Sequence, residues 1–280
     1  MNAVTQLKPV MKRRLDIVTI TPEKAMELLE LNTLNRPLDQ QHVFRIMRQI
    51  KEGKWRFNGD TIKIADGGDI VDGQHRLWAI VEAKMPAETV IVHGVPRSAF
   101  ATIDTLSKPR GGRDILALNG VAKYRQQASG ALVWLIRWQR NIMTEYRVPK
   151  NRIENSDIEE AYAHHPGIVA AAERTTYAVR GLASAQTFTF LYYIMSTRNQ
   201  EIADRMLDTL ENPSGVSIHD PFFQLRSYLA SDKHKLGRQA EVVMALAIKA
   251  ANAAKADEKI GKLHWRNQGE KREAFPKLKI

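Results

Sequence analysis

The chain contains no cysteine among its 280 residues. This absence excludes a disulfide framework, a thiolate metal site and a cysteine nucleophile. Long apolar runs are also missing, because no stretch approaches the roughly 20 apolar residues of a membrane span. The first residues contain no apolar run of signal-peptide length either. We therefore expect a cytoplasmic protein without membrane contact.

Several signatures of catalytic sites are absent as well. The sequence has no His-Glu-x-x-His pair of the zinc-protease type, no Gly-x-Ser-x-Gly elbow and no Walker A sequence. Positive charge is abundant instead, with 42 lysines and arginines against 31 acids and a formal net charge of +11. This balance favours a polyanion or a nucleotide as partner over an acidic protein or a cationic substrate.

The length fits one large or two ordinary domains, and a change of pattern near residue 112 favours two. Residues 15–112 alternate strand and helix patterns, whereas residues 113–265 show one helix pattern after another. Residues 1–14 and 266–280 are basic and are predicted to be flexible tails, either solubilising or in contact with nucleic acid. The predicted fold class is α+β, with a small α/β domain followed by an all-α domain.

The first domain is predicted to contain four strands and three helices. Thr21-Pro22-Glu23 is typical of a helix start, with a cap residue, an N-terminal proline and an early acid. Asp39 is placed to cap the second helix, with Leu38 stapled onto Val43. The predicted strands are 17–20, 61–64, 70–71 and 89–92, the second and third forming a hairpin, and the predicted helices are 22–31, 40–52 and about 75–84.

The second domain is predicted to be entirely helical. A long helix is expected from Tyr124 to Tyr146, and Ser156-Asp157-Ile158-Glu159 is typical of a capping box. His164-His165 is expected to cap a helix C-terminus rather than to bind a metal. Further helices are predicted over 184–196, 200–210, 220–230 and 238–256, and the aromatic residues Phe188, Phe190, Tyr192 and Tyr193 are expected in the core.

The stretch Ile70-Val71-Asp72-Gly73-Gln74-His75-Arg76-Leu77-Trp78-Ala79 is the most informative. Two β-branched residues lead through Asp-Gly into a helical pattern, which predicts a strand, a tight turn and a helix. A glycine allows close approach of a ligand, and the first turn of a helix favours an anion. His75 and Arg76 fall in that first turn, where cations do not stabilise the helix dipole. They favour a bound phosphate, the alternative being a plain turn with two solvated side chains.

Three further groups of residues are candidates. Asp72 is the candidate metal ligand or general base, because phosphate sites recruit Mg²⁺ through acids, unless it only forms the turn. Arg45 and Arg48 share one side of their helix and can meet a nucleic-acid backbone or form a solvated face. Residues 104–114 form either a phosphate-binding loop or a solvated basic linker, and the candidate phosphate contacts there are Thr105, Ser107, Lys108, Arg110 and Arg113.

The sequence resembles the ParB/sulfiredoxin superfamily in its pentapeptide Asp72-Gly73-Gln74-His75-Arg76. Asn35-Arg36-Pro37, Glu52-Gly53 and a strand pair precede this pentapeptide, as the resemblance requires. More narrowly it is similar to DGQHR-type and ParB-like proteins of phage, plasmid and DNA-modification gene clusters. The resemblance covers about Leu15 to Gly112 and implies a turn that binds nucleotide phosphates. It implies phosphate or nucleotide contacts at Gly73, Gln74, His75 and Arg76, with Asn35 and Arg36 facing the ligand unless they only stop a helix.

Two departures limit what this resemblance implies. The sulfiredoxin branch places a catalytic cysteine just before its His-Arg, so the missing cysteine excludes sulfinic acid repair. Gln74-His75 stands where ParB clamps have a Gly-Glu-Arg-Arg type box, so CTP specificity and clamp behaviour do not carry over.

Our leading hypothesis is a protein that binds a nucleoside triphosphate with Mg²⁺, or a nucleic-acid phosphate, in DNA transactions of a phage or mobile element. As an enzyme it would be a phosphotransferase or NTPase. Arg76 and Lys108 would then stabilise phosphate charge, His75 would position or protonate, and Asp72 would hold the metal or activate the acceptor. The alternatives are a non-enzymatic DNA-binding regulator or partitioning factor and, third, a ParB-like nuclease. Assembly into a homo-oligomer is left open.

Overall fold

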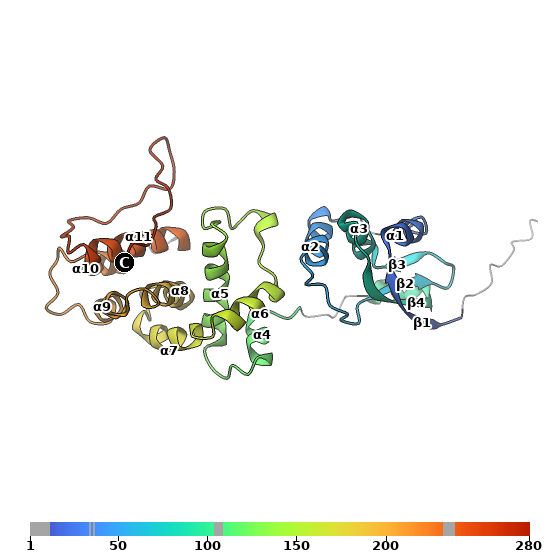
Figure 1. Cartoon of the computed structure of the whole chain (residues 1–280), viewed down its shortest axis with the longest axis horizontal. Coiled ribbons are helices and arrows are strands. Elements are labelled where there is room, and N and C mark those ends of the chain that lie inside the picture. Colours follow the sequence, from blue (N-terminus) through green and yellow to red (C-terminus); the bar gives the residue numbers. More distant parts are fainter. Residues whose placement is uncertain (1–11, 34, 36, 104–108, 232–238) are drawn as a thin grey trace, which may run out of the picture. The chain divides into compact units, whose positions relative to one another are not determined.

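The computed structural model describes residues 12–33, 35, 37–103, 109–231 and 239–280. The chain divides into two compact units, with the boundary between Pro109 and Arg110, slightly before the predicted position (Figure 1). The mixed α+β class is confirmed, with the described strands in the first unit and the second unit helical. Within the described ranges, no helix has the length and apolar character needed to cross a membrane.

The first unit is built on a four-stranded sheet. Its strands are β1 (Arg14–Ile20), β2 (Thr61–Ala65), β3 (Ile70–Asp72) and β4 (Ala87–Val95), in the spatial order β1-β4-β2-β3. β4 pairs antiparallel with β1 and parallel with β2, and β2 forms the predicted antiparallel hairpin with β3. β1 starts earlier than predicted because Arg14 pairs with His93 of the longer β4. The prediction of a flexible tail is therefore wrong at Arg14. Residues 1–11 of that predicted tail lie outside the described residues.

Three helices, α1 (Pro22–Leu29), α2 (Gln40–Lys51) and α3 (Gln74–Ala83), supply the apolar side chains that pack with those of the sheet, among them Ile62 and Ile64 of β2. Both predicted caps are confirmed. The Thr21 hydroxyl accepts a hydrogen bond from the Lys24 N–H, and the Asp39 carboxylate accepts from the N–H groups of Gln41 and His42. A short 3-10 helix, η1 (Arg97–Thr102), follows β4 and contacts β3.

The face of the sheet that points away from this core is apolar at the β1 edge and charged at the β3 edge. Side chains alternate along a strand, so Lys63 points away from the core that contains Ile62 and Ile64. The strand register places Leu15, Val92, Lys63 and Asp72 in one row across β1, β4, β2 and β3. Leu15 is 71% exposed. This face therefore changes from exposed hydrophobic side chains at β1 to an ion pair at β3.

The second unit surrounds one large hydrophobic core. Phe188 and Phe190 are completely buried and Tyr192 nearly so, while Tyr193 packs on the core from outside, which confirms the aromatic cluster as core. The helices predicted after residue 184 are confirmed apart from small shifts at their ends. The elements are α4 (Gly112–Leu118), α5 (Arg125–Gln139), η2 (Pro149–Asn151), α6 (Asn155–His164), α7 (Ile168–Ala178), α8 (Ala185–Ser196), α9 (Gln200–Glu211), α10 (Pro221–Ala230) and α11 (Ala240–Lys255).

Two helix boundaries in this unit differ from the prediction. α5 ends at Gln139 instead of Tyr146, because Asn141 adopts a left-handed conformation with φ +56°. The chain then turns back, and the Tyr146 ring lies 5.0 Å from that of Trp134 on α5. The capping box of α6 also starts earlier than predicted. The Asp157 carboxylate, rather than that of Glu159, accepts the cap N–H, which comes from Glu154 at 2.9 Å.

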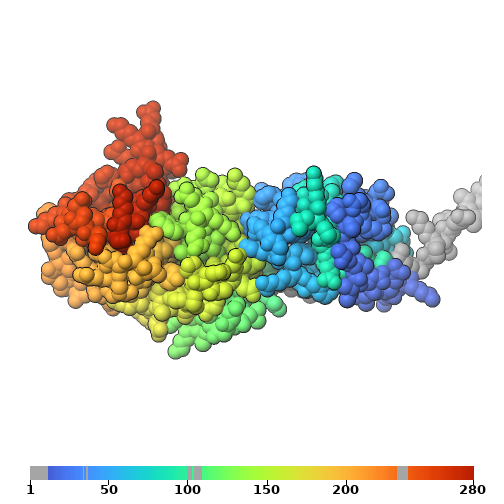
Figure 2. All heavy atoms as spheres, in the orientation of Figure 1, coloured from blue at the N-terminus to red at the C-terminus, as the bar shows by residue number. Residues whose placement is uncertain are grey.

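Residues 266–280 are not a flexible tail, and the predicted end of the helical domain at residue 265 is wrong. The C-terminal segment, residues 263–280, returns to the helices and packs on their core through Leu263, Trp265, Phe275, Leu278 and Ile280. Part of the red end of the chain projects from the surface (Figure 2). Asn252 of α11 donates to the Lys277 carbonyl and accepts from the Lys279 N–H, both at 2.8 Å. Leu278 is buried. The apolar side chains that dock are separated by lysines, which is why composition alone suggested a tail.

Candidate functional site

The turn between β3 and α3 requires glycine at position 73. Gly73 has a φ of +100°, which L side chains rarely adopt. A Cβ at this position would lie 2.8 Å from Cγ1 of Ile62 and 3.1 Å from its Cα. The backbone of the turn therefore packs directly on β2, and this contact fixes where α3 begins.

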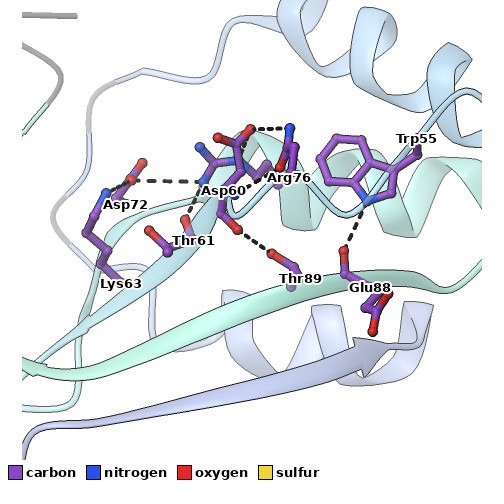
Figure 3. A network of polar contacts seen from close by, with 9 residues as sticks. Trp55, Asp60, Thr61, Lys63, Asp72, Arg76, Glu88 and Thr89 are labelled. Carbon is purple, nitrogen blue, oxygen red and sulfur yellow. Dashed lines mark hydrogen bonds and ion pairs between the residues drawn. The ribbon is translucent and has the colours of Figure 1, made fainter.

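Four charged side chains gather beside this turn and form what we term the charged network: Asp60, Lys63, Asp72 and Arg76 (Figure 3). Lys63 Nζ forms an ion pair with Asp72 Oδ2. Arg76 donates from Nη1 to the Thr61 carbonyl, and this nitrogen lies 3.9 Å from Asp72 Oδ2. Arg76 Nε lies 3.8 Å from Asp60 Oδ2. Two cations and two carboxylates thus balance one another near the first turn of α3.

The charged network is open to solvent to different degrees. The side chain of Asp60 is 51% exposed, whereas those of Lys63, Arg76 and Asp72 are 26%, 20% and 14% exposed. The two cations are therefore partly open to solvent, whereas Asp72 is mostly covered. The backbone around Asp60 is held in place, because the Thr89 hydroxyl donates to the Asp60 carbonyl at 2.9 Å.

Asp72, the predicted metal ligand and general base, is engaged by Lys63 and lies near Arg76. Among the residues that the structure describes, no group of three or more His, Asp or Glu side chains is suited to hold a metal ion. A Mg²⁺ ion at Asp72 would thus take much of its coordination from phosphate oxygens and water, as Mg²⁺ commonly does beside one or two carboxylates.

His75 and Gln74 point into the unit rather than toward solvent. His75 is 6% exposed, and its Nε2 accepts a hydrogen bond from the Asp39 N–H at 3.0 Å. The Nε2 atom of His75 is thus engaged with the start of α2. Gln74 accepts through Oε1 from the Asn32 amide at 3.1 Å. These side chains connect α3 to the start of α2 and to the segment after α1.

Asn35 also has a structural contact. Its amide donates to Asn32 Oδ1 at 2.7 Å and to the Ile70 carbonyl at 3.0 Å, which ties the loop after α1 to β3. The residue lies in the loop after α1, and its amide is engaged within the first unit. Arg36 lies outside the described residues, as do Thr105, Ser107 and Lys108 of the predicted phosphate loop.

The described end of that loop belongs to the second unit. The Arg110 carbonyl accepts from the Asn155 amide of α6 at 2.8 Å. Arg113 lies in the first turn of α4, 3.8 Å from Asp114. The prediction that places Arg110 in the first domain is wrong, because its backbone is hydrogen-bonded to a helix of the second unit.

The predicted nucleic-acid contacts Arg45 and Arg48 lie on α2 and are both half-buried. Arg48 Nε is 3.8 Å from Glu52 Oε1, and its side chain is only 16% exposed. Much of the Arg48 side chain is thus covered within the first unit. The contact of these two arginines with nucleic acid stays a prediction.

Lys63 and Asp60 did not emerge from the sequence pattern. A signal for Lys63 exists, because it lies between Ile62 and Ile64 in an alternating strand and so faces away from the core. The hairpin register then places it opposite Asp72. Asp60 precedes the strand and carries no comparable signal.

The site as a whole can stabilise negative charge and supply carboxylates. Lys63, Arg76 and the start of α3 favour an anion, and Asp60 and Asp72 are suited to a hard cation. No protein-family model, curated protein or solved structure matches the chain.

Proposed function

We propose that the first unit binds the phosphate groups of a nucleoside triphosphate, or of a nucleic acid, at the turn between β3 and α3. The observation that supports this most directly is the charged network, in which Lys63 and Arg76 lie beside the N-terminus of a helix and remain partly exposed. A helix N-terminus carries partial positive charge and favours anions. The resemblance to the ParB/sulfiredoxin superfamily implies phosphate binding at the same turn.

Ligand binding would exchange internal ion pairs for contacts with phosphate. The Lys63 and Asp72 side chains are mostly covered, so their ion pair has to be exchanged directly for contacts with the ligand. Hydrogen bonds between cations and phosphate oxygens are stronger than neutral ones. Asp60 and Asp72, once released, are suited to a Mg²⁺ ion that the phosphates also coordinate.

Binding, rather than a specific reaction, is the function that the geometry supports. The hydrogen bond from the Asp39 N–H engages Nε2 of His75, one of the two ring nitrogens that could position or protonate a substrate. Asp72 remains the candidate base for phosphoryl transfer or hydrolysis, after its release from Lys63.

Calorimetric titration of the full chain with ATP, CTP and GTP, each with Mg²⁺, tests this proposal. Lys63→Gln is expected to weaken binding at least tenfold, because it removes a cation without touching the core. Arg97→Gln is the matched control, since Arg97 is also ion-paired in the first unit, to Asp69 at 2.6 Å. A short DNA duplex is titrated in the same way, and the proposal fails if neither a nucleotide nor the duplex binds the wild-type chain, or if both variants weaken binding equally.

A second candidate function is that of a non-enzymatic DNA-binding protein, in which the turn only stabilises the fold. The inward contacts of Gln74 and His75 favour it. Most of the net charge of +11 also falls in residues 110–280. This function predicts duplex binding that weakens steeply with salt and persists in Lys63→Gln. Gel-shift titrations over a series of salt concentrations measure it, and absence of any shift at low salt would contradict it.

A further inference from the structure

The C-terminal segment contains a turn over residues 266–273, which we term the basic turn. The Glu273 N–H donates to the Arg266 carbonyl at 2.8 Å, and the Arg272 N–H donates to the Gly269 carbonyl at 3.1 Å. Gly269 has a φ of +82°, a conformation that glycine adopts without strain. These contacts close the backbone into a loop. Figure 1 shows part of the chain beyond α11 extending away from the helices.

The base of the basic turn is fixed to the second unit. Trp265, directly before it, is 8% exposed, and its indole N–H donates to the Ala274 carbonyl at 3.1 Å. Lys249 of α11 forms an ion pair with Glu273 at 2.7 Å. The Glu273 carboxylate also accepts from the Arg266 N–H at 3.2 Å. The turn is therefore held at both ends, and it presents its side chains from a defined backbone.

The basic turn carries positive charge that no carboxylate balances. Residues 266–272 contain three cations, Arg266, Lys271 and Arg272, and one acid, Glu270. All four of these residues are exposed. None of the four side chains forms an ion pair with another residue that the structure describes. The cations of the turn are therefore available to a partner.

Two arginines of the helices show the contrast. Arg140 Nη2 lies 2.9 Å from Asp157 Oδ1, and Arg174 Nη2 lies 2.7 Å from Asp208 Oδ1. Three like charges on one short loop repel one another, so they do not explain how the segment folds. Such a group attracts a polyanion, and the planar N–H donors of arginine match the oxygens of phosphate.

The remaining residues of the basic turn favour a nucleic acid over an anionic membrane. Between its cations lie Asn267, Gln268 and Gly269, so the turn has no apolar side chain to enter a lipid layer. Gln268 is exposed, and its amide offers the donor and the acceptor that suit base edges in a DNA groove.

We propose that the basic turn binds the phosphate backbone of duplex DNA. Arg266 and Arg272 donate to phosphate oxygens, and Lys271 adds positive charge. This proposal rests on the second candidate function, that of a DNA-binding protein, and it assigns the contact to the second unit, separately from Lys63 and Arg76. Because the base of the turn is already fixed, DNA binding orders little additional backbone.

The test is a titration of a short fluorescent DNA duplex with the full chain, followed by anisotropy at a series of sodium chloride concentrations. The triple variant Arg266→Gln, Lys271→Gln, Arg272→Gln is expected to weaken binding by about tenfold or more at 0.1 M salt. The logarithm of the association constant falls with the logarithm of salt concentration by about 0.9 per phosphate contact. Loss of three contacts should therefore reduce that slope by about 2–3.

A matched control removes the same charge from other exposed positions of the second unit. Lys123→Gln, Arg125→Gln, Arg180→Gln is such a triple variant, and it should bind within about twofold of wild type. Glu270→Gln removes the one acid of the turn and is expected to tighten binding about two- to threefold. All substituted residues are exposed, so a thermal midpoint equal to wild type is expected for each variant.

Further arms separate this surface from the first unit and from lipid. Lys63→Gln should leave duplex binding intact. If Lys63→Gln abolishes duplex binding and the triple variant of the turn does not, the DNA contact belongs to the first unit and this proposal is overturned. Vesicles of phosphatidylcholine and phosphatidylserine replace the duplex in a parallel titration, and binding to them that exceeds duplex binding and depends on the turn would also overturn it.

The remaining outcomes distinguish the proposal from the function on which it rests. Duplex binding that is equal in wild type and in the triple variant of the turn overturns the proposal but leaves DNA binding in place. Equal weakening in the control variant overturns it as well, because net charge then explains the effect. Absence of duplex binding in wild type overturns both the DNA-binding function and the proposal.

Discussion

Replacement of Gly73 by alanine should destabilise the first unit by more than a left-handed backbone alone can explain. Holding a non-glycine residue at positive φ costs about 1–2 kcal/mol. At Gly73 the new Cβ also meets Cγ1 of Ile62 at 2.8 Å and its Cα at 3.1 Å. Backbone cannot give way as a flexible side chain can, so this overlap adds about 1–3 kcal/mol, the usual range for overpacking. The two effects together amount to about 2–5 kcal/mol.

Gly53 provides the control for the backbone effect. Its φ is +68°, and a Cβ there would have no atom of the described chain within 4 Å beyond its two adjacent residues. Gly53→Ala should therefore cost about 1 kcal/mol, since only the backbone conformation opposes it. The difference between the two variants isolates the contact of the turn with β2.

Urea unfolding followed by circular dichroism measures both variants, with a separate transition for each unit if they unfold independently. Ile62→Ala in the Gly73→Ala background removes the nearest contact, so the double variant should be more stable than the sum of the single effects predicts. The reasoning is refuted if Gly73→Ala destabilises no more than Gly53→Ala, or if the effects of Gly73→Ala and Ile62→Ala simply add.

Two further predictions concern the second unit. Burial, and to a lesser degree His164, lowers the pKa of His165 below its ordinary value of 6.5. As the pH falls, the unfolded chain therefore binds the proton before the folded chain does, and the free energy of unfolding should decrease as pH drops through 6.5. The urea midpoint should fall between pH 7.5 and 5.5, and this fall should be smaller in His165→Gln. Leu278→Ala should lower the stability of the second unit by about 2–3 kcal/mol, because Leu278 is 9% exposed and packs on the helical core. A thermal midpoint equal to wild type would show that the C-terminal segment adds no stability.

Features set by a few neighbouring residues could be predicted from the sequence. Thr21 and Asp39 cap their helices as expected, because a cap is a hydrogen bond within one turn. The hairpin of β2 and β3 also follows from its turn and its alternation. The end of α5 was misplaced because the apolar spacing continues past Asn141, whose left-handed backbone stops the helix. The pattern shows which side chains are apolar but not where the chain turns back.

The contacts of the candidate site depend on residues far apart in the chain. His75 was expected at the mouth of a phosphate site, yet it holds the Asp39 N–H, and its position in the first turn of α3 does not indicate which helix packs beside it. Lys63 joins Asp72 only through the register of two strands. The C-terminal segment was missed because Leu278 and Phe275 are separated by charged or small residues, and only docking on the helices brings them together.

The edge strand β1 limits the protein concentration at which the chain stays free of aggregation. β1 is at the end of the strand order, and Leu15 and Ile17 along it are 71% and 66% exposed. An exposed apolar edge is a template on which another molecule can add a strand and start aggregation. Lys12, Arg13 and Arg14 directly precede or begin this strand, so two approaching edges repel one another. That protection acts over about 10 Å at 0.1 M salt and about 3 Å at 1 M, and concentrated salt therefore removes it.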